Sequence, residues 1–198
     1  MKIKINKILV LLTFTVLLTE MCGFSTPFRK EKLNQKQEKP LKIFTLGDSN
    51  GALPFGWVNQ LRGIRVNDSI FNISISGNTI GFNNNGRASL NTLASIGSHM
   101  EKAFAVLGKI DRIIIMLGTN DCKAVFSDSL QFVPGNMKKM IAGIRKIAGE
   151  HKDKPVIYIV SPPPFGPDEM LEEKYKGGLE RVSQLKEELE ILAGEESV

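Results

Sequence analysis

Four short apolar runs alternate with longer amphipathic segments from residue 41 onward. The runs cover 41–46, 69–75, 112–117 and 155–160, and each leads into a loop that contains Gly or Pro. Short runs rich in β-branched residues and bounded by such loops are typical of β-strands. The run at 112–117 is almost continuously apolar, as in a strand that is buried on both faces. We therefore expect four strands.

The segments between these runs have apolar residues at helical spacing. Their apolar side chains recur every three or four positions, which predicts amphipathic helices. The predicted helices lie around 57–64, 90–107, 137–147 and 179–192. Gly108 and Gly194 stand just past the last apolar positions of the second and fourth helices, and glycine in this place predicts a helix end.

The alternation of strands and helices predicts an α/β fold. It favours a parallel sheet with helices on both faces. We see no internal repeat and no domain boundary after residue 41, so we expect one domain at 41–198. In such a sheet the ligand site lies beyond the carboxyl ends of the strands. The loops that begin at Gly47, Ser76 and Gly118 occupy this edge.

A basic start and an apolar run precede the predicted domain. Three lysines stand among the first seven residues, and the apolar run covers Ile8–Leu18. The run is too short to span a bilayer, which takes about 20 residues. The pattern is typical of a secretory signal peptide, and a buried N-terminal helix is the alternative.

We expect this signal peptide to cover residues 1–25, with cleavage after Ser25. Residues 26–40 are polar and predict a linker with little to bury. Lipidation at Cys22, as in a bacterial lipoprotein, is the alternative and offers the one membrane contact that we expect. Either route exports the domain to the periplasm or the extracellular side.

The formal net charge of +5 belongs to the first forty residues. They hold 8 Lys and Arg against 3 Glu, whereas residues 41–198 hold 18 basic and 18 acidic residues. The predicted domain is therefore balanced in charge, and we expect no nucleic-acid partner. Cys122 is the one cysteine in this domain, so it forms no internal disulfide and is expected to be a small buried hydrophobe.

Three loops carry residue types suited to acyl transfer. Ser49 stands at the tip of a predicted strand-to-helix turn, where its hydroxyl can face solvent and a helix start offers backbone N–H groups. Gly77 allows its N–H to approach a ligand closely, and Asn120 offers an uncharged amide donor. We expect the Ser49 N–H, the Gly77 N–H and Asn120 Nδ2 to converge on one oxyanion. Taken alone, Gly-Asp-Ser also builds ordinary turns and helix caps.

In this order the three loops resemble the sequence blocks of the SGNH hydrolases, also called the GDSL esterase/lipase superfamily. The Gly-Asp-Ser at 47–49 matches the first block, with Asn50 where the name-giving motif has Leu. Gly77 matches the second block, and the Gly-Thr-Asn-Asp at 118–121 matches the third. The resemblance extends over about residues 41–194.

The resemblance implies a three-layer α/β/α sandwich with a flavodoxin-like parallel sheet. It implies ester hydrolysis without a metal or other cofactor, on a small-molecule, glycan or lipid ester. It also implies that Ser49 is the nucleophile, and that Gly77 and Asn120 are oxyanion donors together with the Ser49 N–H.

One block of that family has no counterpart here, the Asp-x-x-His that supplies the general base near the C-terminus. The sequence has two histidines. His99 falls about 16 Å along its predicted helix from the loop edge, and His151 falls at the opposite end of the sheet. We expect both to be surface or capping residues. We expect Asp48 and Asp121 to shape their loops by accepting backbone N–H bonds.

We therefore interpret the domain as C-terminally incomplete and impaired as an enzyme, with an open sheet edge beside the fourth strand. An interrupted gene, a fragment of a longer protein or a partner chain that supplies the rest would each explain this. The alternative function is a non-catalytic binding module or an inactive esterase fragment. A nucleotide-binding protein fits the sheet, but the sequence lacks the G-x-G-x-x-G and G-x-x-x-x-G-K-[ST] motifs. The sequence leaves the oligomeric state open.

Overall fold

A computed structural model describes residues 39–198. The predicted signal peptide at 1–25, the lipidation site at Cys22 and nearly all of the predicted linker at 26–40 lie outside the described residues. Among residues 39–198, no helix is long and apolar enough to cross a bilayer.

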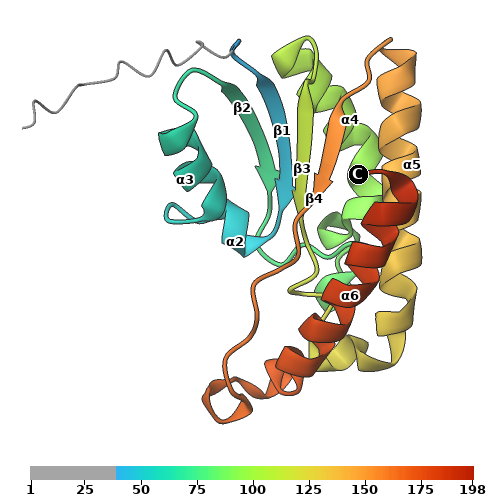
Figure 1. Cartoon of the computed structure of the whole chain (residues 1–198). Coiled ribbons are helices and arrows are strands. Elements are labelled where there is room, and N and C mark those ends of the chain that lie inside the picture. The colour runs from blue at the N-terminus through green and yellow to red at the C-terminus, as the bar shows by residue number, and fades with distance from the viewer. Residues whose placement is uncertain (1–38) are drawn as a thin grey trace, which may run out of the picture. The chain divides into compact units, whose positions relative to one another are not determined.

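The four predicted strands form one parallel sheet. They are β1 (Lys42–Gly47), β2 (Ser69–Ser74), β3 (Arg112–Met116) and β4 (Val156–Ile159). Their order in the sheet is β2-β1-β3-β4, and every neighbouring pair is parallel (Figure 1). The strand bounds agree with the sequence prediction to within one residue. Because all four strands run the same way, the loops after β1, β2 and β3 leave the sheet at one edge.

Helices cover both faces of this sheet, as predicted. The short α2 (Ser49–Ala52) and α3 (Trp57–Ile64) lie on the side of β2. The longer helices α4 (Thr92–Leu107), α5 (Val133–Glu150) and α6 (Gly178–Glu196) lie on the other side (Figure 1). Short 3-10 segments, η1 to η5, occupy Asn84–Gly86, Ala88–Leu90, Ala124–Phe132, Asp168–Met170 and Glu173–Tyr175.

The two glycines that predicted helix ends behave differently. Gly108 ends α4 with φ at 73°, and its N–H donates to the Phe104 carbonyl. The prediction for Gly194 is wrong, because α6 continues to Glu196 and ends where Ser197 takes φ of 54°. A glycine weakens a helix by about 1 kcal/mol without breaking its hydrogen bonds. Here Arg145 of α5 binds the Glu196 carboxylate at 2.6 Å and holds the last turn.

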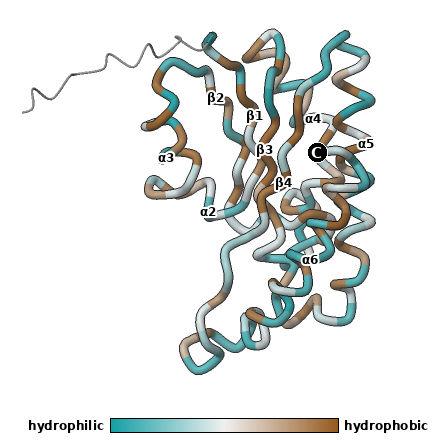
Figure 2. Tube along the Cα trace, viewed as in Figure 1, coloured by the Kyte–Doolittle hydropathy of each residue, from teal (hydrophilic) through white to brown (hydrophobic). Residues whose placement is uncertain are grey.

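The main core lies between the sheet and helices α4, α5 and α6. Inward side chains of the strands, such as Phe44, Leu46, Ile113 and Ile115, are fully buried there. Figure 2 shows the hydrophobic residues concentrated along the strands. Burial of these side chains supplies most of the energy that keeps the strands in register and therefore fixes where their carboxyl ends meet.

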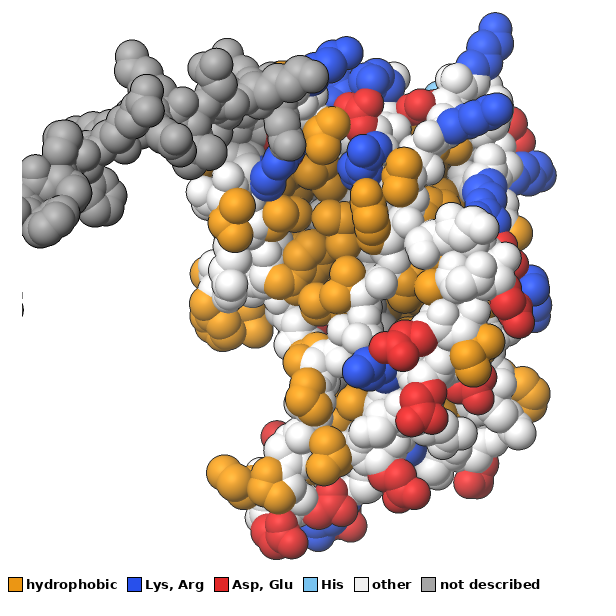
Figure 3. Space-filling model, in the orientation of Figure 1, with side chains coloured by type: hydrophobic (Ala, Val, Ile, Leu, Met, Phe, Trp, Pro, Cys, Tyr) orange, Lys and Arg blue, Asp and Glu red, His pale blue; other side chains and the backbone are white. Residues whose placement is uncertain are grey.

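The opposite face of the sheet is partly open at β4. Ile157 points into the core, whereas Val156 and Tyr158 are 45% and 44% exposed. Within the described residues β4 is the last strand, so none of them pairs with its outer edge, as expected. Figure 3 shows hydrophobic side chains gathered on this side of the molecule, where Figure 1 places the strands. Parallel sheets are normally covered on both faces, so this surface is unusual.

Candidate active site

Ser49 stands on a tight turn between β1 and α2. Asp48 caps the one-turn helix, because its Oδ1 accepts the Asn50 N–H at 2.8 Å. A Cβ at Gly47 would lie 2.6 Å from Ser74 Oγ, so any other residue here would displace the Ser74 side chain. Ser49 itself is half-buried, and no described residue forms a hydrogen bond with its hydroxyl. The turn thus presents the hydroxyl without a base bound to it.

Gly77 begins the loop after β2 in a conformation that favours glycine. Its φ is 93°, and an added Cβ would lie 3.3 Å from the Leu90 side chain. The Gly77 carbonyl accepts a hydrogen bond from Asn84 Nδ2 at 2.6 Å. The peptide between Gly77 and Asn78 is therefore held from η1.

Asn120 stands in the loop after β3. Gly118 starts this loop with φ at 125°, and an added Cβ would lie 2.7 Å from Leu185 of α6. Asn120 is 5% exposed, and its Nδ2 donates to the Asn78 carbonyl at 3.0 Å. An amide nitrogen carries two hydrogens, so one donor of Asn120 is not used by this bond.

Asn78 joins the three loops. Its side-chain Nδ2 donates to the Gly47 carbonyl at 3.2 Å, directly before the Ser49 turn. Its own carbonyl accepts the Asn120 amide, and Gly77 is its chain neighbour. A second bridge, from Asn50 Nδ2 to Thr119 Oγ1 at 3.1 Å, links the first loop to the third. The loops that carry Ser49, Gly77 and Asn120 therefore lie together at one edge of the sheet, and the chemical roles of these residues stay predictions.

Two buried carboxyl groups shape these loops, as expected. Both oxygens of Asp121 accept the Ile80 N–H at 3.0 Å, which ties the third loop to the second. Burial, with a smaller contribution from the nearby Asp48, raises the pKa of Asp121 to about 7 against the opposing effect of the backbone donors. Burial also raises the pKa of Asp48, although the Asn50 N–H opposes this.

Cys122 is a buried thiol, as predicted. It is fully buried and free, and burial raises the pKa of the thiol to about 12. A thiol with such a pKa is not a nucleophile at neutral pH. The Cys122 carbonyl accepts Arg181 Nε at 2.8 Å, which fastens the third loop to α6.

The two histidines lie on the helical layer. The expectation for His99 was wrong: it faces the protein interior, is 7% exposed, and burial lowers its pKa. Its position on the core stripe of α4 explains this burial. The capping role expected of His151 is confirmed, because it ends α5, stacks on Phe104 at 3.9 Å and lies 3.2 Å from the Glu101 carboxylate. No described histidine contacts Ser49.

Sequence reasoning missed the supporting residues Asn78, Asn84 and Lys123. Lys123 Nζ donates to Asn84 Oδ1 at 3.2 Å, and Asn84 in turn reaches Gly77. A signal was available, because asparagines cluster at 83–85 and asparagine side chains commonly bond to nearby backbone in loops. Their targets lie in other loops, which the sequence did not reveal.

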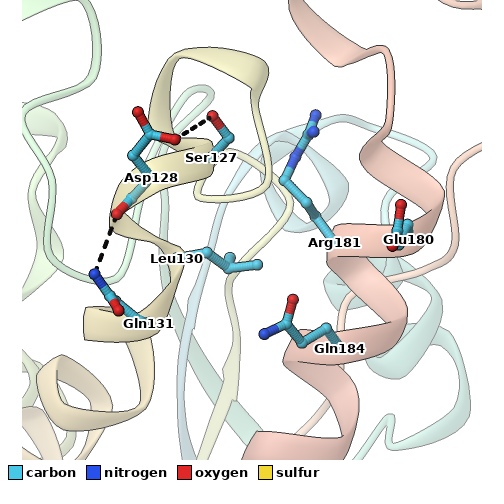
Figure 4. A pocket seen from close by; sticks show the side chains of 7 residues that line it. All are labelled: Ser127, Asp128, Leu130, Gln131, Glu180, Arg181 and Gln184. Atoms are coloured by element: carbon cyan, nitrogen blue, oxygen red, sulfur yellow. Dashed lines mark hydrogen bonds between the residues drawn. The ribbon is translucent and has the colours of Figure 1, made fainter.

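A separate groove lies between η3 and α6 (Figure 4). Its lining residues are Ser127, Asp128, Leu130, Gln131, Glu180, Arg181 and Gln184. None of the predicted site residues lines this groove. Arg181 connects it to the third loop through the bond to the Cys122 carbonyl.

Comparison with known proteins identifies the fold. No family model matches the chain, and no curated protein sequence matches it either. Among solved structures, the carbohydrate acetylesterase Est24 from Sinorhizobium meliloti is similar, with a TM-score of 0.66 and 24% identity over 79% of this chain and 80% of that one. The aryl esterase of M. smegmatis has a TM-score of 0.66 and 23% identity, with the same coverage of both chains.

A lipase/acylhydrolase from Enterococcus faecalis is also similar, with a TM-score of 0.52 and 16% identity over 80% of this chain and 74% of that one. At this level of identity the likeness concerns the fold, and it agrees with the fold that the three sequence blocks predict. The described chain therefore has the fold of the SGNH hydrolases.

Proposed function

We propose that this protein is an exported serine hydrolase of carboxylic esters, with Ser49 as the nucleophile. The observation that carries the proposal is the buried hydrogen-bonded junction at Asn78, which unites the loops of Ser49, Gly77 and Asn120. The names of the structurally similar acetylesterase and aryl esterase support the same reaction class.

In the proposed reaction Ser49 Oγ attacks the ester carbonyl carbon and passes its proton to solvent water, which in turn protonates the alcohol oxygen as it leaves. The carbonyl oxygen becomes an oxyanion, which the N–H groups of Ser49 and Gly77 and the Asn120 amide stabilise. Collapse expels the alcohol and leaves an acyl-serine, which water then hydrolyses to the acid and free Ser49. Since no described histidine contacts Ser49, we propose that residues 39–198 alone perform these steps slowly, with a loss on the order of 10⁴-fold.

The proposed substrates are small esters met outside the cytoplasm. Export rests on the signal-peptide pattern before residue 26, with the lipid anchor at Cys22 as the alternative. Acetylated carbohydrates and aryl esters are the first substrates to test, because the similar proteins are named for them.

A fluorophosphonate probe tests the proposal, because it reacts with an activated serine in the presence of oxyanion donors. We expect mass spectrometry to locate the adduct on Ser49 of the full chain, and we expect Ser49→Ala to abolish it. Ser98→Ala is the matched control, since this exposed serine lies on α4. Equal labelling of the Ser49→Ala variant refutes the assignment of the nucleophile. A folded chain that is not labelled at all supports the alternative, a non-catalytic binding module.

A further inference from the structure

Lys123 is an unusual lysine because it is buried beside the candidate site. It follows Cys122 in the third loop and is 8% exposed. Lysine side chains are rarely buried without a charged partner. Among residues 39–198 no carboxylate forms an ion pair with it. Its Nζ donates to Asn84 Oδ1 at 3.2 Å, and the Tyr175 ring centroid lies 5.8 Å from Nζ.

Asn84 connects Lys123 to Gly77, because its side-chain amide forms a hydrogen bond with each of them. Asn84 is 1% exposed, so both ends of its amide are removed from water. Its Oδ1 accepts from Lys123, and its Nδ2 donates to the Gly77 carbonyl at 2.6 Å. Consecutive hydrogen bonds through one amide polarise each other, so a cationic donor at Oδ1 strengthens the bond that Nδ2 makes.

The acceptor of the second hydrogen bond is the carbonyl of Gly77, a residue with unusual conformational freedom. Gly77 has φ at 93°, and a glycine gains much conformational entropy when it leaves such a conformation. A strong hydrogen bond to its carbonyl restricts rotation at this residue. The carbonyl belongs to the peptide that Gly77 shares with Asn78, and the φ and ψ torsions of Gly77 separate this peptide from the one that carries the Gly77 N–H. Fixing the first peptide therefore narrows the directions that the Gly77 N–H can take.

We propose that Lys123, acting through Asn84, is a positioning residue that holds the Gly77 N–H in the direction of the oxyanion. The inference rests on the proposed function, because it assigns the Gly77 N–H a donor role there. Lys123 touches neither the substrate nor the reacting atoms in this proposal. Burying the cation of Lys123 costs free energy. A side chain needed only for packing would not need this charge, since Met is a close apolar substitute.

The test compares Lys123→Met with Lys123→Arg and with Lys174→Met in the full chain. Lys123→Met keeps an unbranched side chain, one atom shorter, and removes its charge. Lys174 is the matched control, since it lies 5.0 Å from the same Tyr175 ring but its side chain is 53% exposed. Two quantities are measured: the rate of Ser49 modification by the fluorophosphonate, and the ¹H–¹⁵N shift and hydrogen exchange of the Gly77 amide.

We expect Lys123→Met to slow modification about tenfold, the effect of one weakened hydrogen bond, and to shift the Gly77 amide signal. Lys123→Arg should recover most of the rate, and Lys174→Met should stay within about twofold of the parent. Asn84→Ala should slow modification at least as much as Lys123→Met, and the double variant should lose no more than Asn84→Ala alone, because Lys123 acts through Asn84. Asn84→Ala also keeps the test decisive if Lys123→Met does not fold.

Three results overturn the proposal. The first is an unchanged Gly77 signal in both Lys123→Met and Asn84→Ala. The second is a modification rate within about twofold of the parent in both. The third is a double variant whose losses multiply, which means independent effects. If the parent chain is not labelled at all, the proposed function fails, whereas the Gly77 amide signal still decides whether Lys123 acts on Gly77 through Asn84.

Discussion

The loops of Ser49, Gly77 and Asn120 and the two histidines of this protein lie in contrasting surroundings. The loops follow parallel strands and are joined through Asn78 by buried hydrogen bonds. His99 faces the core from α4, and His151 ends α5 beside Phe104. One region thus joins three loops by hydrogen bonds, while the other holds the described histidines in structural roles.

This contrast teaches that parallel strands bring the loops after them together, whereas the packing of each helix decides where its histidine faces. Each proposed donor lies in a loop after a strand, so sheet packing brings the three loops to one edge. A general base must come from a segment whose position the sheet order alone does not set. We therefore expect substitutions in the loops to change the reactivity of Ser49, and substitutions of the histidines to leave it unchanged.

The largest effect on the rate of Ser49 modification is expected from Asn120→Ala. Loss of one oxyanion donor typically lowers a rate 100- to 1000-fold, about 3 to 4 kcal/mol, and we expect Ser49 modification to slow by that factor. The rate is measured with the fluorophosphonate under pseudo-first-order conditions. Asn59→Ala, on the exposed side of α3, is the control and should react like the parent. An unchanged rate in Asn120→Ala would remove Asn120 from the oxyanion site.

A smaller effect, on stability, is expected from Asp121→Asn. The pKa of Asp121 in the folded chain is about 7, above the ordinary value of 3.8, so folding favours its protonated form. Its stabilising contribution is present at low pH and is lost as the pH rises towards 7. Relative to the parent, the Asn variant should gain about 3 kcal/mol between about pH 4.5 and about pH 7.5.

Urea unfolding across this pH range measures the difference in the free energy of unfolding between the Asn variant and the parent. The comparison with the parent cancels the titration of other groups, such as Asp68 and Asp111, whose pKa values are lowered by hydrogen bonds and charges from Arg65 and Lys109 respectively. Parallel stability curves for the two proteins would show that Asp121 does not titrate in this range.

The smallest effects are expected from His151→Ala and His99→Gln. Neither change should alter Ser49 modification by more than about twofold, because neither ring contacts Ser49. His151→Ala removes the stack on Phe104 and the contact with Glu101, so it should cost less than about 1 kcal/mol in stability. Modification rates and thermal melts of both variants check this. A tenfold loss of rate in either would erase the distinction between the two regions.

Several features of the fold and the site were predictable because they depend on local sequence. The strands were predicted to within one residue, since apolar runs bounded by turn residues leave little choice of structure. The end of α4 at Gly108 and the cap made by Asp48 follow from the local chemistry of glycine and aspartate, whereas Asp121 binds the distant Ile80 N–H. The helix end predicted at Gly194 was wrong because Arg145, far away in sequence, stabilises the turn that follows Gly194.

By itself the sequence determined the α/β alternation, the three loops with their Gly, Ser and Asn residues, and the edge of the sheet at which they meet. Only the tertiary structure decided that Asn78 binds Gly47 and Asn120, that Lys123 reaches Gly77 through Asn84, and that His99 turns inward. Periodicity and turn chemistry are local and can be recognised along the chain. Hydrogen bonds between loops depend on how the packed sheet brings distant residues together.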